Sequence, residues 1–365
     1  MGDLNYQSYF PEPESKAGWR YLKSAEEVRS IAGMDAEKLD IIRQMHEFLY
    51  GGDSWGIVII RRGYLVREFY TTNVLVPTRF DVWSVTKSFT STAWGILFDD
   101  SRNNKLPGGK KVDLDSYAYE YIPEGYPLTD PRKERITIGH LLSMTSGIPG
   151  VKHGVIGMPT STGNGPFEHA LGRCPNRYGK WVDKLTAEPG TSWDYSDPAF
   201  AHLSLAFKNI MNCEMSDYLK ERVFDPIGIE NLSWDVQGGS GFIGPHTNAH
   251  TGIHISAREL ARFGYLFLRR GKWKGKQIVP ERWIDLISKA SQDLNPSYSY
   301  SWLTNSEGTC WPELPRDTFS LNEGYRSNRC FIIPSLDLVV ARVGSGPAEW
   351  KKGQLVKDII DTVID

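Results

Sequence analysis

Two residues with complementary chemistry, Ser84 and Lys87, form the only Ser-x-x-Lys pattern in this sequence of 365 residues. Residues 88–99 contain no proline and carry apolar side chains at helical spacing, so we expect a helix with both side chains on one side of its start. A serine hydroxyl becomes a nucleophile when a base removes its proton, and a lysine amine can do this once burial lowers its pKa. The N–H groups at the helix start would also stabilise an oxyanion. Taken alone, the same pattern fits a capped helix with a surface lysine.

Tyr195 offers a second group for proton transfer. It is the only tyrosine with Asp or Asn two places on, and it lies between a turn at residues 188–190 and a helix expected to begin at Pro198. A phenol next to an ammonium group can ionise well below its ordinary pKa of about 10 and then act as a base. The alternative is a structural tyrosine at a helix entry, with Asp197 as the N-cap of that helix.

A third segment, residues 321–328, precedes the last expected hairpin of the chain. A strand edge at this place would line the site and donate a backbone N–H group to an oxyanion. The glycine of the segment, Gly324, would let a ligand approach the backbone closely.

The expected elements place strands at both ends of the chain and helices in its middle. A β-hairpin is expected over residues 55–70 and a second one around Pro334, whereas residues 1–33 look like a loosely structured arm. Helices are expected over residues 35–50, 138–144, 198–211, 216–224, 256–270, 280–290 and 349–364.

This order of elements predicts two domains. Residues 1–87 and 255–365 are expected to form an α/β sheet domain, and residues 88–254 a mainly helical domain. Residues 148–181 are rich in glycine and irregular, and a loop of this length is usually functional or disordered. We expect it to cover the site as a lid.

Composition and charge narrow the function classes. The net charge of −2 gives no sign of a nucleic-acid partner, and no apolar run reaches the roughly 20 residues that span a bilayer. The N-terminus lacks the basic and apolar parts of a secretory signal, so we expect a cytoplasmic protein and leave open a mature periplasmic or secreted form. Four widely spaced cysteines suit free thiols. His246, His250 and His254 have metal-ligand spacing only on a helix, which the glycines around them disfavour, so we expect no metal and no cofactor.

The three segments resemble the serine β-lactamase and penicillin-recognising family, and in particular its branch of class C β-lactamases, D,D-peptidases and esterases, which includes 6-aminohexanoate-dimer hydrolase-like enzymes. The resemblance covers the chain from about Gly56 to Val343 and includes the blocks at residues 138–147, 187–196 and 256–264. It implies an α+β fold in which an antiparallel sheet flanked by helices joins a mainly helical domain. It also implies a site between the two domains.

The resemblance implies a role for each matching residue. Ser84 would be the acylated nucleophile, and Lys87 would accept its proton. Tyr195 would act as general base in acylation and then as the acid that protonates the leaving group. The backbone N–H groups of Ser84 and Tyr325 would form the oxyanion hole.

Two departures from the family pattern bear on the substrate. The second motif ends in Asp197 where the family usually has Asn, and the third motif is Asn322-Glu323-Gly324 in place of Lys-Thr-Gly or His-x-Gly. A second candidate for the third motif, His250-Thr251-Gly252, precedes the helix at 256–270 rather than following it, and its contribution is left open. The acidic Glu323 would repel the carboxylate of a β-lactam, which favours small esters or linear amides. Arg326, expected on the same strand face as Gly324, is the cation that would offset this repulsion, with Arg329 and Arg342 nearby.

These observations leave several functions open. A hydrolase of small esters or linear amides is favoured, with a true β-lactamase or a D-amino-acid peptidase as alternatives, and a non-catalytic binding or scaffold protein as the alternative from another class. The expected partner is a small ester or amide, without nucleic acid or membrane, and a homodimer is possible. Candidate substrate-binding residues are Asp197, Asn322, Glu323, Gly324, Arg326 and, from the lid, Tyr178 and Trp181.

Overall fold

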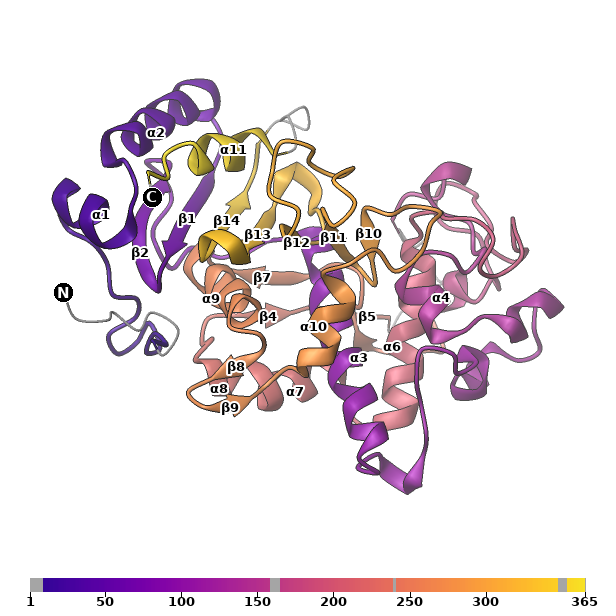
Figure 1. Ribbon diagram of the computed structural model, residues 1–365. Helices are drawn as coiled ribbons and strands as arrows, with labels where there is room; N and C mark the ends of the chain where they lie inside the picture. Colours follow the sequence, from indigo (N-terminus) through magenta and orange to yellow (C-terminus); the bar gives the residue numbers. More distant parts are fainter. Residues whose placement is uncertain (1–8, 158–164, 239–240, 347–352, 365) are drawn as a thin grey trace.

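The largest unit of the computed structural model is a seven-stranded antiparallel sheet with the strand order β10-β11-β12-β13-β14-β1-β2 (Figure 1). The structure describes residues 9–157, 165–238, 241–346 and 353–364. The strands of this sheet are β10 (Tyr298–Ser299), β11 (Trp302–Thr304), β12 (Phe319–Leu321), β13 (Arg329–Ile333), β14 (Leu338–Gly344), β1 (Trp55–Arg61) and β2 (Tyr64–Tyr70). Its centre joins the two ends of the chain, because β1 pairs with β14 from Trp55 opposite Gly344 to Arg61 opposite Leu338.

Helices cover both faces of this sheet, which explains why every residue of β1 and β14 is buried. On one face, Ile57 and Ile59 of β1 pack against α1 (Ala25–Ala32), α2 (Ala36–Tyr50) and α11 (Gln354–Ile360). On the other face, Val58 and Ile60 join the core that contains α9 (Ala257–Leu268). Strands that are buried on both faces read as continuous apolar runs, as β1 does.

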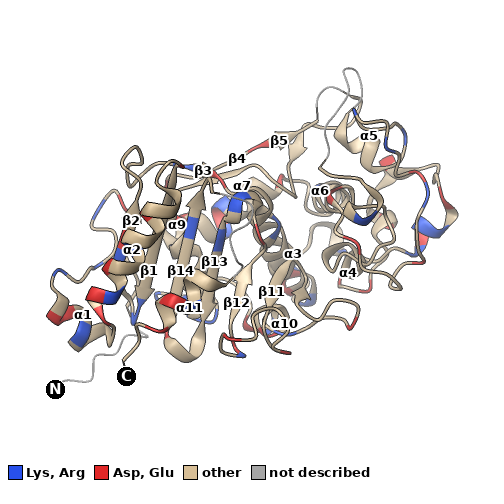
Figure 2. Ribbon diagram, turned by 90° about the horizontal axis from the view of Figure 1, so that it is seen from above, with Lys and Arg blue, Asp and Glu red and all other residues tan. Residues whose placement is uncertain are grey.

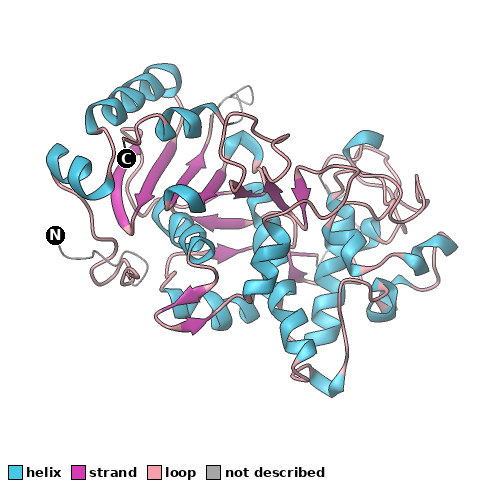
Figure 3. Ribbon diagram, viewed as in Figure 1, coloured by secondary structure: helices cyan, strands magenta, loops and turns pink. Residues whose placement is uncertain are grey.

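The second part of the molecule is mainly helical and is built around α3 (Thr86–Arg102) and α6 (Asp197–Met211) (Figure 3). Almost all of α3 is buried, because this helix lies between the large sheet and the helical part. The shorter helices are α4 (Ile138–Leu142), α5 (Pro166–Ala170), α7 (Met215–Leu219), α8 (Asp225–Ile227) and α10 (Glu281–Ile287), with a π-helical segment at Lys220–Phe224.

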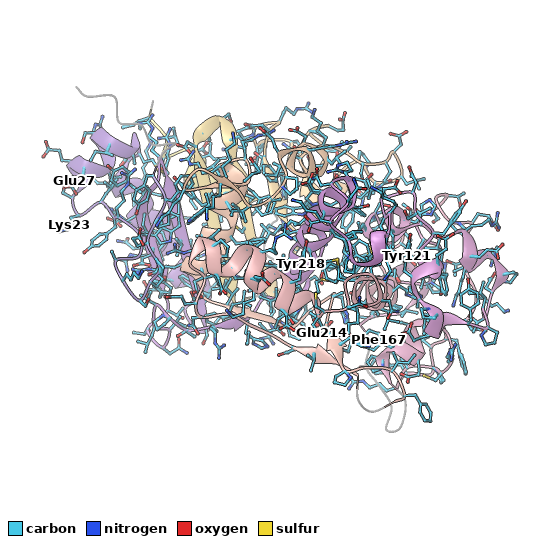
Figure 4. The ribbon with its side chains drawn as sticks, turned by 90° about the horizontal axis from the view of Figure 1, so that it is seen from below. Lys23, Glu27, Tyr121, Phe167, Glu214 and Tyr218 are labelled. Carbon is cyan, nitrogen blue, oxygen red and sulfur yellow. The ribbon has the colours of Figure 1, made fainter. Side chains whose placement is uncertain are left out.

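Short strands connect the two parts. β3 (Phe80–Asp81), β7 (Ile253–Ile255) and β4 (Ser233–Trp234) form a three-stranded sheet, and β5 (Val236–Gln237) pairs with β6 (His246–Thr247). The remaining pair is β8 (Lys272–Trp273) with β9 (Lys276–Gln277). Glu214, labelled in Figure 4, holds the β5–β6 pair to the helical part, because its carboxylate accepts hydrogen bonds from the backbone and side chain of Thr247 and contacts His246 Nδ1 at 3.0 Å.

The α+β architecture expected from the sequence is confirmed, including both hairpins and the long helix after Ser84. The N-terminal arm differs from expectation, because α1 forms within it. Ser24 and Glu27 form a capping box at the start of α1, and Gly33 ends the helix in the left-handed conformation. The closing helix is shorter than expected at Gln354–Ile360, and residues 347–352 lie outside the described residues.

The boundaries of the two expected domains stay a prediction. The three-stranded sheet takes β3 from the first expected segment, β4 from the second and β7 from the junction with the third. Within the described parts of the chain, no helix is long and apolar enough to cross a membrane. Lys and Arg are interspersed with Asp and Glu over the ribbon in Figure 2, in keeping with the net charge of −2.

Candidate active site

Ser84 lies in a single 3-10 turn, Trp83–Val85, that leads directly into α3. The expected α-helix therefore begins after Ser84 rather than at it. Trp83 has a φ of 52°, a left-handed conformation that is uncommon for a bulky residue and is often found at functional sites. The Asp81 carboxylate holds this turn by accepting the N–H of Trp83 at 2.8 Å. The turn brings Ser84 to the wall of a cavity.

Lys87 is fully buried, and its ammonium group contacts three oxygen atoms. Its Nζ donates to Ser84 Oγ at 2.9 Å and to the backbone carbonyl of His250 at 3.1 Å, and it lies 2.7 Å from Asp197 Oδ1. The ammonium group thus makes two hydrogen bonds and one ion pair. A charge at this depth is tolerated because it is hydrogen-bonded and paired with a carboxylate.

Asp197 is the partner of Lys87 rather than the N-cap that sequence reasoning offered as an alternative. The cap of α6 is Ser196, whose Oγ accepts the N–H of Ala199 at 3.2 Å, and Pro198 occupies the first turn. The Asp197 carboxylate is therefore free to face Lys87. Burial raises the pKa of Asp197, but the charge of Lys87, the His250 imidazole and the backbone N–H of Gly157 outweigh it, and the pKa lies below its usual value.

Tyr195 places its ring beside Lys87, with the Nζ atom 4.8 Å from the ring centroid. Its hydroxyl donates a long hydrogen bond to Asn322 Oδ1, at 3.4 Å. Burial and the Asp197 carboxylate raise the pKa of Tyr195 well above its ordinary value, and hydrogen bonds with Ser84 and Asn322 only partly counter this. This direction is opposite to the lowered phenol pKa expected from the sequence, and burial of the phenol is its main cause.

The third segment packs directly against the residues before Ser84. The backbone N–H of Asn322 donates to Ser88 Oγ at 2.8 Å, and its side-chain Nδ2 donates to the hydroxyl of Tyr298 at 3.0 Å. A Cβ atom on Gly324 would lie 2.2 Å from the carbonyl oxygen of Val82. The space beside Gly324 is thus filled by the protein's own backbone, not by the ligand that the sequence suggested.

A cavity of about 540 Å³ opens at Ser84. Seven residues expected at the site line it, namely Ser84, Tyr195, Asn322, Glu323, Gly324, Tyr325 and Arg326. Arg329, which the sequence offered as a nearby cation, also lines the cavity. The other lining residues were not selected from the sequence, namely Trp193, Asn295, Ser297, Tyr298, Leu303, Thr309, Cys310, Trp311 and Ser327. Several of these residues come from the loops around β10 and β11. These loops are far from Ser84 in the sequence, and no motif in them indicated that they reach the site.

Tyr178 and Trp181 do not line the cavity, and their side chains are 61% and 51% exposed. Their role in substrate binding stays a prediction. The start of the expected lid does lie against the site, because the Asp194 carboxylate accepts the N–H groups of Gly150 and Lys152. Residues 158–164 of the lid lie outside the described residues, and the function of the segment stays a prediction.

The charges in the cavity differ from those expected. Glu323 forms an ion pair with the buried Arg329 at 2.7 Å, so its charge is largely offset. Arg326 is not on a strand, because β12 ends at Leu321 and Arg326 lies in the 3-10 turn Tyr325–Ser327 with a φ of 63°. Arg342 donates to the backbone carbonyls of this turn, including that of Arg326 at 3.0 Å, and so supports it from behind.

His250 contacts the centre of the site with its backbone carbonyl. It does not take the place of the third motif, which residues 322–324 occupy at the cavity. Its carbonyl accepts from Lys87, and burial lowers the pKa of its imidazole to about 4. Among the residues that the structure describes, no group of three side chains could hold a metal ion. His246 and His254 instead contact Glu214 and Asp235 respectively.

The fold brings Ser84, Lys87 and Tyr195 together beside one cavity. Residues 57–347 match the family model "Beta-lactamase", and the chain belongs to this family. It is 24% identical to the unguisins hydrolase ungD' of Aspergillus campestris over 256 residues, which span 70% of this chain and 42% of that protein.

Two solved structures share the fold. One is a protein from Bacillus anthracis provisionally described as a 6-aminohexanoate-dimer hydrolase, with a TM-score of 0.68, 18% identity, and coverage of 97% of this chain and 89% of that one. The other is EstCE1, described as a hydrolase with promiscuous acyltransferase activity, with a TM-score of 0.67, 18% identity, and coverage of 90% and 98%. The family expected from the sequence motifs is confirmed.

Proposed function

We propose that this protein is a serine hydrolase that cleaves an ester or amide through an acyl-enzyme on Ser84. The observation that carries the proposal is the distance of 2.9 Å between Ser84 Oγ and the Nζ atom of the buried Lys87, at the wall of a 540 Å³ cavity. This arrangement supports removal of the serine proton as the serine oxygen attacks a carbonyl carbon. The N–H groups of Ser84 and Tyr325 are the proposed oxyanion hole. Water then attacks the acyl-enzyme and releases the acid.

The similar proteins support a hydrolase but leave the substrate open. Their printed descriptions name a hydrolase of unguisins, a provisional hydrolase of 6-aminohexanoate dimers and a hydrolase with acyltransferase activity. These descriptions share the word hydrolase and name no common substrate. A fold of this kind supports many substrates, so the substrate class has to be argued from the cavity.

We infer that small esters or linear amides are better substrates than β-lactams. The third motif presents the neutral amide of Asn322 where the family usually has a lysine or histidine, so the cation that would bind a β-lactam carboxylate is missing from that position. Repulsion by Glu323 adds less than expected, because Arg329 lies 2.7 Å away. Arg326 lines the cavity and is the group most able to supply the positive charge that is missing from the third motif.

A hydrolysis panel tests this proposal. The specificity constant kcat/KM is measured for p-nitrophenyl butyrate, a linear amide with a free amino group, and the β-lactam nitrocefin, with Ser84→Ala as control. We expect the best of the first two substrates to exceed nitrocefin by at least tenfold, and the variant to lose all three activities. A nitrocefin value at least tenfold higher than the others would contradict the preference and assign the carboxylate site to Arg326. Binding of substrates without turnover would favour the non-catalytic alternative.

A further inference from the structure

We propose that Lys87 and Asp197 act as one proton-accepting pair for Ser84, while Tyr195 keeps its own proton until it protonates the leaving group. This division of roles rests on the proposed hydrolase function and deepens it. It makes Asp197 a positioning residue that acts through Lys87, rather than a substrate-binding residue. It also removes Tyr195 from the role of base in acylation that the family resemblance implies.

The first observation is the geometry of the ion pair. The Nζ atom of Lys87 lies 2.7 Å from Asp197 Oδ1 and 2.9 Å from Ser84 Oγ, so it stands between the serine proton and the carboxylate. Lys87 is fully buried, and the Asp197 side chain is 14% exposed. The pair has no net charge. A proton can therefore move from Ser84 to Lys87 as another moves from Lys87 to Asp197, without any change in the total charge of the pair and the serine.

The second observation is that the groups around Tyr195 favour its protonated form. Its hydroxyl donates to Asn322 Oδ1, and Nδ2 of the same amide donates to the hydroxyl of Tyr298, which orients the oxygen toward Tyr195. The family's usual lysine or histidine at the position of Asn322 would place a cation there. A cation would favour the deprotonated phenolate. A neutral amide oxygen that accepts a hydrogen bond from the phenol instead favours the protonated form of Tyr195.

The charged groups that face the pair and Tyr195 support the same assignment. The charge of Lys87 is offset by Asp197 on α6, and Glu323, which follows β12, is paired with Arg329 of β13. His250, which precedes β7, is neutral near pH 7 because burial lowers the pKa of its imidazole to about 4. Tyr298 of β10 is also neutral, because burial raises the pKa of its phenol. The charges of these groups offset one another, so together they do not favour loss of the proton from Tyr195.

The protons balance over one acylation. Ser84 Oγ forms a bond to the substrate carbonyl carbon, its proton passes to Lys87 Nζ, and one Lys87 proton passes to Asp197 Oδ1. The bond between the carbonyl carbon and the leaving group breaks as the Tyr195 hydroxyl gives its proton to the leaving atom. The proton on Asp197 then returns to Lys87, which reprotonates the Tyr195 oxygen, so the net change is transfer of the Ser84 proton to the leaving group. Water repeats the sequence in deacylation.

The leaving group distinguishes the two roles of Tyr195. We compare kcat/KM of Tyr195→Phe and the unchanged protein on p-nitrophenyl butyrate, whose leaving group departs as an anion, and on ethyl butyrate, whose leaving group needs a proton. If Tyr195 is the acid, we expect a loss of about 10²- to 10⁴-fold on ethyl butyrate and less than tenfold on p-nitrophenyl butyrate. Equal losses on both esters would mean that Tyr195 is the base for Ser84 and would overturn the proposal.

The pH profile of Asp197→Asn tests the pair. In the unchanged protein, kcat/KM for p-nitrophenyl butyrate should be flat from pH 6 to 9, because the low pKa of Asp197 keeps the carboxylate ionised. In Asp197→Asn, Lys87 must first lose a proton to solvent. The profile should then rise with pH, by up to tenfold per pH unit, because activity follows the fraction of Lys87 that has lost its proton. A variant whose activity is a constant fraction of the unchanged protein at every pH, or equal to it, would overturn the proposal.

A matched control separates this effect from loss of an ion pair in general. Asp130 is buried and lies 2.7 Å from Arg132, away from the cavity. Asp130→Asn should lower stability and leave the shape of the pH profile unchanged. Ser84→Ala separates the two proposals, because hydrolysis that persists in this variant refutes the hydrolase mechanism itself. Hydrolysis that needs Ser84 but shows a flat Asp197→Asn profile refutes only the division of roles.

Discussion

Substitution of Gly324 by alanine tests how tightly the third segment is held against the nucleophile. The backbone at Gly324 has a φ of −80°, which alanine adopts freely, so only the added methyl group matters. That methyl group would lie 2.2 Å from the carbonyl oxygen of Val82, whereas real contacts of this kind are not shorter than 3.0 Å. One of the two backbones must therefore move by at least 0.8 Å, the difference between these distances.

The movement would change the distance between the two proposed oxyanion donors, the N–H groups of Ser84 and Tyr325. Val82 lies two residues before Ser84, and Gly324 lies directly before Tyr325. Misplacement of catalytic groups by about 1 Å can cost about 10²-fold in rate. Overpacking of a closed site typically costs about 1–3 kcal/mol of stability. We therefore expect Gly324→Ala to fold, to unfold at a lower temperature and to lose at least about 10²-fold in kcat/KM on p-nitrophenyl butyrate.

The matched control is Gly52→Ala, because a Cβ atom at Gly52 meets nothing within 4 Å. Both variants are assayed for kcat/KM and for thermal unfolding. Gly52→Ala should match the unchanged protein in both. If Gly324→Ala retains activity within threefold of the unchanged protein, the close approach of the third segment to Ser84 does not position the catalytic groups, and the reasoning fails.

The contact of Lys87 with Asp197 and that of Glu214 with β6 give further predictions about stability. Lys87→Met should destabilise the protein by about 3–5 kcal/mol in chemical denaturation, because it leaves Asp197 buried and unpaired. Adding Asp197→Asn should restore much of that loss, and a double variant as unstable as the sum of both changes would contradict the pairing. Burial raises the pKa of Glu214, but contacts with His246 and Thr247 dominate and lower it to about 2. The resulting stability of about 1–3 kcal/mol should be full above the unfolded-state pKa of about 4.3 and should be lost as the pH falls toward 2. Glu214→Gln should remove this dependence between pH 5 and 3, and an unchanged pH curve would count against the contact.

The parts of the site that depend on local spacing could be predicted from the sequence. The spacing of three residues places Ser84 and Lys87 on the same side of the chain, and Lys87 Nζ lies 2.9 Å from Ser84 Oγ. The β1–β2 hairpin follows from the apolar, β-branched residues of β1 and the alternating residues of β2. The capping box of Ser24 and Glu27 was also present in the sequence and could have revealed α1.

The parts that depend on tertiary contacts could not be predicted. Ser196 and Asp197 are both good N-cap residues, and only the position of Lys87 in the folded protein decides that Asp197 faces the site. The carbonyl of His250 reaches Lys87 from 163 residues away. The pairing of Glu323 with Arg329 across the turn after β12 weakens the charge argument made from the sequence.

Covalent labelling of Ser84 tests the central claim most directly. The protein is incubated with a fluorophosphonate, which reacts with activated serine hydroxyls, and the digested product is mapped by mass spectrometry. We expect one adduct per chain on the peptide that contains Ser84, no adduct in Ser84→Ala, and loss of ester hydrolysis in step with labelling. An unmodified Ser84, or hydrolysis that survives complete labelling of Ser84, would contradict the account.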